Sequence, residues 1–173
     1  LCMLMMNCAH IGEVQSSVWD HDTVAICEEA GVRLLYKGKI EARIASFHEI
    51  APGAICDMFP FEVLSIDGGC VVLQCETAYW MRNTFGALHG GMSSTILDQA
   101  MSLAAFCVKT GEGPTPCIEM QLSFHRPVQP GDSVQIRVNV LSVTKSLIRL
   151  SSQLHQHEKL CVSAAGTYFQ KHS

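Results

Sequence analysis

The sequence predicts an α+β domain in which an antiparallel β-sheet wraps around one long central helix. Residues 89–108 form a run that is apolar on almost every side, and strand-like segments lie on both sides of it. A helix without a polar face has to be covered over most of its surface. Strands segregated about a single helix and joined by short turns form an antiparallel sheet. Hydrophobic residues make up 48% of the chain and charged residues 16%, which provides enough apolar material for such a core.

Six predicted strands consist of β-branched and apolar residues bounded by turn residues. Two precede the helix, at residues 61–66 and 70–79, and Asp67-Gly68-Gly69 joins them as a hairpin. Four follow it, at residues 117–127, 133–143, 146–156 and 159–170. Their turns are expected at residues 130–132, 144–145 and 157–158, which contain Pro, Gly, Asp and other residues common in turns.

The chain divides into a predicted helical N-terminal extension, residues 1–57, and a main domain, residues 58–173. Residues 23–30 and 39–50 have helical spacing, with Ile40, Ile44 and Phe47 on one face of the second segment. Gly31 and the run at 51–53 are suitable stops. A length of 173 residues fits one core, since single domains run to roughly 100–200 residues.

Charge and cysteine content exclude several classes of protein. Residues 1–57 hold four Lys/Arg against eight Asp/Glu, and residues 58–173 hold eight of each, so there is no basic face for a nucleic acid. No run of ~18 apolar residues could span a membrane. The nine cysteines include no C-x-x-C pair and sit mostly in apolar runs. This favours reduced thiols in a cytoplasmic protein without a metal site.

Asp98 lies in the middle of the apolar helix. Burying an unpaired carboxylate is costly, so the side chain is expected to be paired, protonated or facing a cavity. One interpretation is structural, with Asp98 bonded to a backbone group or an Arg. The other is a general base or nucleophile in a semi-apolar pocket.

His89-Gly90-Gly91 opens the same helix. Glycines there let the backbone approach a ligand closely, and the free N–H groups at the positive helix end favour an anion or a developing oxyanion. A glycine pair can also serve packing, and His89 can be a structural histidine. Asp98 lies ~12 Å further along the helix and ~80° around it from Gly90, so one ligand cannot reach both in one chain. Two helices packed antiparallel about a two-fold axis would bring each Asp98 towards the other chain's Gly90.

Asn83 precedes this helix by a short loop. Its side-chain amide can both donate and accept, so it could hold a water or orient a carboxylate. An Asn in a loop is also a common turn residue.

Read together, Asn83-Thr84-Phe85-Gly86-Ala87-Leu88-His89-Gly90-Gly91 followed by Asp98 resembles the hot-dog-fold thioesterases of the phenylacetate-degradation (PaaI-like) type. Phe124-His125-Arg126-Pro127 with Pro130-Gly131-Asp132 resembles the strand-and-turn signature of that family, and Ala165-Gly166-Thr167-Tyr168 its closing strand. The resemblance covers roughly residues 58–170.

The resemblance implies a hot-dog fold and a homodimer, with a dimer of dimers (homotetramer) as its further assembly. It implies hydrolysis of acyl-CoA without a metal or organic cofactor. The N–H of Gly90 would polarise the thioester carbonyl with support from His89. Asp98 of the partner subunit would activate water or attack directly, and Asn83 would place the water.

Substrate binding is expected at Gly91 and near Thr115 and Cys117. Cys117 stands where the family often has Ser or Thr, which leaves its role open. For the CoA phosphates the candidate cations are Arg82, Arg126 and Lys145. Each of these three can equally be an ordinary surface charge.

Two other functions compete with thioester hydrolysis. A hot-dog dehydratase or hydratase resembles a different pattern, with a Gly-His-Phe-Pro-like loop and a helical Glu, and neither is found in this sequence. A non-catalytic acyl-CoA sensor would use the same fold without turnover, but the presence of both Asp98 and Asn83 favours an enzyme.

Overall fold

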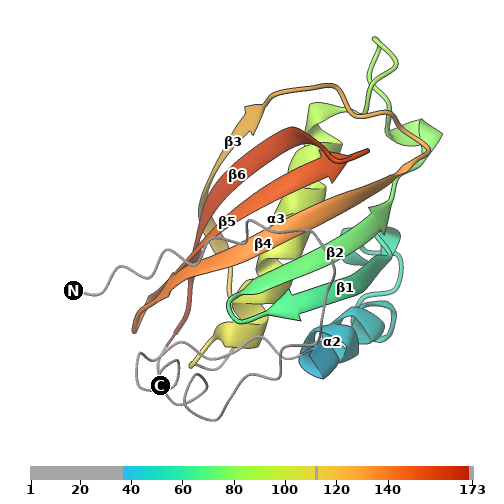
Figure 1. Ribbon diagram of the computed structural model, residues 1–173. Coiled ribbons are helices and arrows are strands. Elements are labelled where there is room, and N and C mark those ends of the chain that lie inside the picture. The colour runs from blue at the N-terminus through green and yellow to red at the C-terminus, as the bar shows by residue number, and fades with distance from the viewer. Residues whose placement is uncertain (1–36, 112, 172–173) are drawn as a thin grey trace.

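A computed structural model describes residues 37–111 and 113–171. Within these residues six strands form one antiparallel sheet in the order β1-β2-β4-β5-β6-β3. The strands are β1 (Phe61–Asp67), β2 (Cys70–Glu76), β3 (Cys117–Phe124), β4 (Ser133–Val143), β5 (Leu147–Gln156) and β6 (Lys159–Phe169). The predicted order of elements is confirmed, and β1 and β3 are the two edges of the sheet (Figure 1).

Helix α3 (Gly90–Val108) lies across the inner face of the sheet and contacts β2, β3, β4, β5 and β6. Figure 1 shows the strands curving around it. Ten of its residues are buried, among them Ile96, Leu97 and Met101. The side of α3 that faces away from the sheet carries the half-buried residues Gln99, Ser102 and Phe106. This side is therefore less covered than expected for a helix that is apolar on almost every side.

Helix α2 (Lys37–Ile50) packs against β1 and α3, and the 3-10 helix η1 (Ile55–Met58) follows it. Ile40 and Phe47 are buried and Ile44 packs against the same core, which confirms the helical face predicted for residues 39–50. The helix predicted at residues 23–30 lies outside the described residues. The division of the chain at 57/58 stays a prediction.

Two strands, β2 and β3, each end three residues earlier than the sequence indicated. Strand β2 stops at Glu76, because the Thr77 hydroxyl donates to the carbonyl of Asp132 and accepts from the N–H of Gly131. The chain then forms the 3-10 turn η2 (Tyr79–Met81). Strand β3 stops at Phe124, because the next two N–H groups, of His125 and Arg126, both donate to the carbonyl of Cys161.

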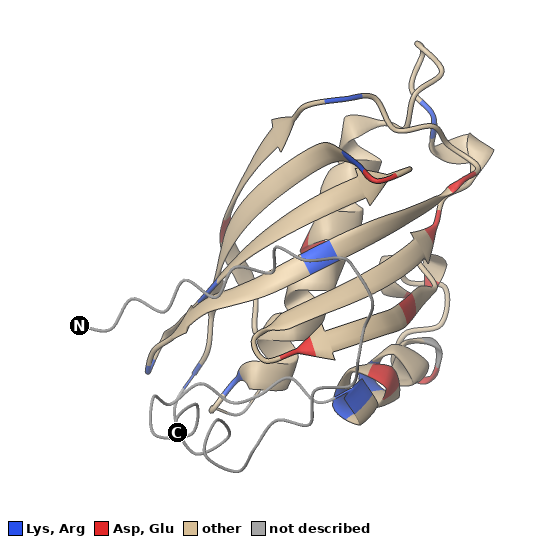
Figure 2. Cartoon of the chain, viewed as in Figure 1, with Lys and Arg blue, Asp and Glu red and all other residues tan. Residues whose placement is uncertain are grey.

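The charged residues are dispersed over the described part of the chain. Figure 2 shows Lys and Arg interspersed with Asp and Glu, without a single basic face. None of the described helices is long and apolar enough to cross a membrane. None of the six described cysteines forms a disulfide.

Candidate active site

His89 caps the first turn of α3. Its backbone is extended, with φ −61° and ψ 135°, and its Nδ1 accepts the N–H of Gly91 at 2.9 Å. The first N–H groups of a helix have no carbonyl partner one turn earlier. The cap occupies the N–H of Gly91, whereas no group among residues 37–111 and 113–171 accepts the N–H of Gly90. This free donor lies at the positive end of the helix dipole, where an anion or a developing oxyanion is stabilised.

Phe124, at the end of β3, lies against Gly90. A Cβ placed on Gly90 would stand 3.5 Å from two atoms of the Phe124 ring, an ordinary van der Waals distance. The ring itself is largely exposed. An alanine therefore fits at position 90, and a larger side chain would displace the ring.

Asp98 is half-buried and is paired with a residue that sequence reasoning did not single out. The Tyr168 hydroxyl, on β6, donates to Asp98 Oδ1 at 2.8 Å and lies 3.2 Å from the Asp98 carbonyl oxygen. Tyr168 is only 1% exposed. Burial, and then the negative charge of Asp98, raise the pKa of Tyr168, so its hydroxyl stays protonated and remains a donor. Of the expected states of Asp98, the paired one is observed.

A signal for Tyr168 exists in the sequence. Within β6 the inward positions Val162, Ala164, Gly166 and Tyr168 alternate with outward ones. Tyr168 is the one residue of that inward row that carries a polar group. Its partner could not be inferred, because it depends on how β6 lies across α3.

Cys117 stands directly opposite Tyr168 in the β3–β6 ladder. Its Sγ donates to the carbonyl of Glu119 at 3.4 Å. Burial first, and the negative charge of Asp98 second, raise the pKa of the Cys117 thiol, while a hydrogen bond with Tyr168 acts in the opposite direction. The thiol is thus a neutral neighbour of Asp98 and not an activated nucleophile.

Asn83 holds the loop that leads into α3. Its Oδ1 accepts the N–H groups of Phe85 at 2.9 Å and Ala87 at 3.2 Å, and its own N–H donates to the carbonyl of Ala87 at 2.7 Å. These bonds fix which end of the amide is oxygen. The NH₂ group is then the end available for a water or a carboxylate.

The three candidate CoA cations do not gather at one place. Arg82 forms an isolated antiparallel β-bridge with Leu88, and the backbone N–H of Leu88 donates to the carbonyl of Val128. Because Val128 closely follows Arg126 in the chain, Arg82 and Arg126 lie at the same end of the domain. Arg126 Nη1 donates to the carbonyl of Leu160 at 2.8 Å. Lys145 is exposed in the turn after β4. The 11 residues of β4 span ~35 Å and separate Lys145 from the end of the domain that holds the two arginines.

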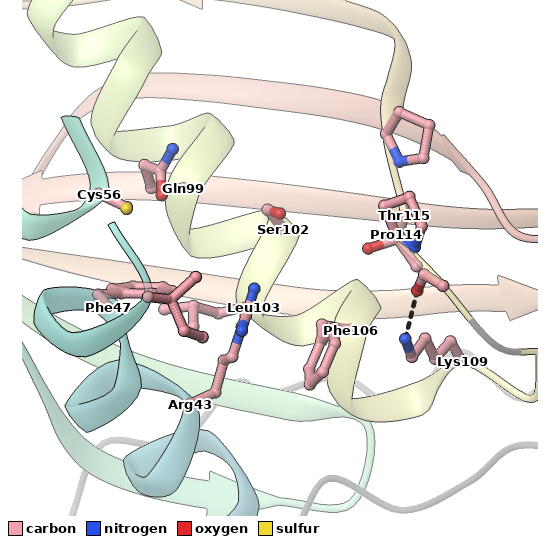
Figure 3. A pocket seen from close by; sticks show the side chains of 13 residues that line it. Arg43, Phe47, Cys56, Gln99, Ser102, Leu103, Phe106, Lys109, Pro114 and Thr115 are labelled. Atoms are coloured by element: carbon pink, nitrogen blue, oxygen red, sulfur yellow. Dashed lines mark hydrogen bonds between the residues drawn. The ribbon is translucent and has the colours of Figure 1, made fainter. Parts of the chain in front are cut away.

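A pocket of about 520 Å³ lies between α2, α3 and the segment 113–116 (Figure 3). Thr115 lines it and is buried. Asp98 is not part of the lining, but Ser102 is, one helical turn beyond Asp98. Pro116, which immediately precedes Cys117, lines it as well. The part that α2 plays in this pocket could not be inferred from the sequence.

Metal chemistry has no obvious site in the described part of the chain. Among those residues no three His, Cys, Asp or Glu side chains are grouped so that they could hold an ion. His157 lies 3.6 Å from Asp132, in the turn after β5, and has no third partner of this kind.

Residues 85–162 match the sequence profile of the thioesterase superfamily. This segment belongs to the thioesterase superfamily. It contains all of α3 with Asp98, the strands β3, β4 and β5, and only the beginning of β6. The resemblance noted in the sequence is confirmed.

A curated relative is a thioesterase, and solved structures share the fold of this chain. Human acyl-coenzyme A thioesterase 13 is 27% identical over 92 residues, which are 53% of this chain but only 65% of that protein. Zebrafish thioesterase superfamily member 2 superposes with a TM-score of 0.66, covering 77% of this chain and 99% of that one at 22% identity. A phenylacetic acid degradation-related protein of Ralstonia eutropha gives 0.64, covering 76% and 98% at 17% identity. The predicted hot-dog fold is confirmed.

Two further likenesses are narrower. A Streptococcus mutans protein with bound acetyl-CoA has a TM-score of 0.57, covering 65% of this chain and 91% of that one at 21% identity. Aspartate–ammonia ligase of Clostridium tetani is 51% identical over 35 residues, which are 20% of this chain and 10% of the ligase. A match to a tenth of an enzyme carries no conclusion about activity.

Proposed function

We propose that the chain hydrolyses acyl-CoA thioesters to free acid and CoA in a site shared by two subunits. The observation that carries this proposal is the division of groups along α3. The helix begins with the free N–H of Gly90 and holds the Asp98 carboxylate ~12 Å further on, so each chain offers two half-sites rather than one site. Supporting this reading, a curated relative is an acyl-coenzyme A thioesterase and one neighbour binds acetyl-CoA.

In the proposed reaction the thioester carbonyl oxygen accepts the N–H of Gly90. Asp98 of the partner subunit removes a proton from water, whose oxygen attacks the carbonyl carbon. The C–S bond then breaks, and the proton passes from Asp98 to the departing CoA thiolate. The cap from His89 keeps the helix start rigid, and the Asn83 NH₂ group helps to place the water. In the alternative form of this mechanism, the Asp98 carboxylate attacks the carbonyl carbon directly.

The edge strand β3 is the proposed dimer contact. It is exposed over most of its length, and Ile118 is 59% exposed. An exposed apolar edge strand is a template for pairing with another chain. Pairing of two β3 strands about a two-fold axis extends the sheet and places two α3 helices antiparallel. Association of two such dimers gives the proposed tetramer.

The role of the Gly90 N–H is tested by a matched pair of substitutions. Gly90→Pro removes the N–H, and proline suits the first position of a helix after an extended His89. Gly90→Ala keeps the N–H, and its Cβ fits beside Phe124. We expect kcat on acyl-CoA, followed by chromatographic detection of CoA, to fall about 10²–10³-fold in Gly90→Pro only. Equal activities of the two variants would contradict the proposal.

Sharing of the site is tested by complementation. Asp98→Asn and Gly90→Pro are each expected to be inactive, and mixed dimers of the two contain one site with neither defect. Co-expression should therefore restore about a quarter of wild-type activity, because half of the dimers are mixed and half of their sites are intact. No recovery from verified mixed dimers would overturn the shared site. Saturable binding of acyl-CoA without turnover by the wild type would instead identify a sensor.

A further inference from the structure

We infer that the loop between η2 and α3 docks the protein on a lipid bilayer with anionic headgroups. We call Tyr79, Trp80, Arg82 and Phe85 the aromatic loop. In the docked state Phe85 enters the hydrocarbon, and the other three side chains lie among the headgroups. The inference is independent of the proposed reaction, because none of these four side chains takes part in the proposed steps of hydrolysis.

Exposed aromatic side chains are concentrated in this loop. Phe85 is 93% exposed, the highest value among the large hydrophobic residues in the described part of the chain. Tyr79 and Trp80 are 69% and 57% exposed, and all three residues fall within a stretch of seven. Exposed apolar side chains gathered in one patch are typical of a surface that contacts a partner or a membrane.

The loop holds Phe85 outward on a fixed backbone. Asn83 Oδ1 accepts the N–H of Phe85 at 2.9 Å, and the N–H of Gly86, with a φ of +84°, donates to the Asn83 carbonyl at 3.1 Å. The β-bridge between Arg82 and Leu88 closes the base of the loop. Figure 1 shows this light-green loop before α3, projecting beyond the ends of the strands. Because the turn is already formed, docking does not have to order it.

The charges around the loop favour anionic lipids. Residues 77–97 contain Arg82 and no Asp or Glu, and residues 120–131 contain Arg126 and no Asp or Glu. Both arginines are exposed at this end of the domain. The acids that border these two segments belong to α3 and the strands or stand next to them: Glu76, Asp98, Glu119 and Asp132. Cations close to a bilayer are attracted by its anionic headgroups.

The order of side chains along the loop matches the layers of a bilayer. Phe85 is at the tip, where an apolar ring gains from burial in hydrocarbon. Tyr79 and Trp80 lie at the base, and these two residue types prefer the headgroup region because each has an apolar body and a polar group. Trp80, Arg82 and Met92 also line a shallow hollow of about 240 Å³, in which a lipid phosphate can meet the guanidinium.

Tryptophan fluorescence tests docking directly. The chain contains two tryptophans, Trp19 and Trp80, so that Trp19→Phe leaves Trp80 as the single emitter. Vesicles of phosphatidylcholine with phosphatidylserine should shift its emission to shorter wavelength, and lipids with brominated chains should quench it. An emission that vesicles leave unchanged would overturn the inference.

Vesicle sedimentation separates the roles of the tip and the cation. Phe85→Ser should lower the partition coefficient at least tenfold, because the ring no longer enters the hydrocarbon. Arg82→Gln should lower it about fivefold on vesicles with phosphatidylserine and leave it unchanged on pure phosphatidylcholine. Leu141→Ser, at a 60% exposed residue near the other end of β4, is the matched control and should partition as the wild type does. Equal partition of Phe85→Ser and Leu141→Ser would contradict the docking surface.

A second copy of the chain is the other occupant that the experiment distinguishes. Light scattering without vesicles should give Phe85→Ser the wild-type mass, and turnover of acyl-CoA in vesicle-free solution should also be unchanged. A lower mass for Phe85→Ser would assign the loop to a contact between copies and overturn the inference. Vesicle binding does not depend on turnover, so failure of the docking surface and failure of the proposed function are read from different measurements.

Discussion

The hydrogen bond from Tyr168 to Asp98 decides how the carboxylate faces the site. It takes up Oδ1, so that Oδ2 is the oxygen left for a water molecule. Because the hydroxyl is buried and stays protonated, it remains a donor that holds the carboxylate in this orientation. Tyr168 is in this view a positioning residue that acts through Asp98.

Tyr168→Phe should therefore lower the rate of the reaction. Without the donor, Oδ1 loses its partner and the orientation of the carboxylate is no longer fixed. We expect kcat to fall about tenfold with little change in KM, because the acyl-CoA contacts are kept. Tyr79→Phe, at an exposed tyrosine, is the control. An unchanged kcat would show that Tyr168 serves packing alone.

Cys117 can report the charge of Asp98 without any turnover. Alkylating reagents attack the thiolate, and the Asp98 carboxylate raises the pKa of this thiol. Asp98→Asn removes the charge, so at a fixed pH more thiolate is present and Cys117 should react faster with iodoacetamide, as measured by peptide mass spectrometry. Cys75, buried and with its pKa raised to about 12, should stay unmodified in both proteins as an internal reference. Equal rates at Cys117 would mean that Asp98 is not charged beside it.

At this scale the sequence identified the residues that conflict with their surroundings. Asp98 in an apolar helix and two glycines at its start are anomalies that can be read without coordinates. Tyr168 and Phe47 do not stand out in the same way, because apolar and aromatic residues are ordinary in a predicted strand or helix. Their place beside the site depends on register and packing, which local spacing does not determine.

Strand β6 supports Asp98 through a glycine. A Cβ on Gly166 would lie 3.1 Å from the Tyr168 ring and 3.2 Å from the end of Met101. These distances are tight, so the ring and the methionine would have to move apart. Gly166 thus makes room for the tyrosine that holds the carboxylate.

Gly166→Ala should lower both stability and activity. Overpacking of a buried site typically costs about 1–3 kcal/mol, which thermal or urea unfolding can measure. The displaced Tyr168 should also lower kcat, as expected for Tyr168→Phe. Ala165→Ser, at the exposed neighbouring position, should change neither property. A Gly166→Ala protein with wild-type stability would show that the core adjusts at no cost.

The existence and order of the elements followed from the sequence, and their ends did not. Thr77 ends β2 by bonding to residues more than 50 positions away, and the N–H groups after Phe124 turn to Cys161. Both terminations depend on tertiary partners. The spacing of Ile40, Ile44 and Phe47 revealed the apolar face of α2. It did not reveal that α2 packs against α3.

The two edges of the sheet differ in their proposed roles. Strand β3 carries exposed apolar side chains beside the site, and β1 lies at the far edge of the sheet, where α2 packs against it. The proposed dimer uses β3 only. Assembly and activity should thus respond to changes at one edge and not at the other.

Ile118→Lys should yield a monomer without activity. A charge on an edge strand opposes pairing with a second strand. Light scattering coupled to size exclusion should give a mass near 18.9 kDa for the variant and about twice that, or a multiple of it, for the wild type. Leu64→Lys, on β1, is the matched control and should keep the wild-type mass. A fully active Ile118→Lys monomer would refute the shared site, since its own Asp98 and Gly90 are unchanged.

In the proposed dimer, one rod-like helix carries the carboxylate of one catalytic centre and the oxyanion donor of the other. A movement of α3 therefore changes the geometry of both centres together. Sliding α3 by a single turn would withdraw both groups at once, and in both centres. Substitutions that move α3 therefore cannot alter one centre alone. A ligand that displaces the helix at one centre would also change the geometry of the other centre.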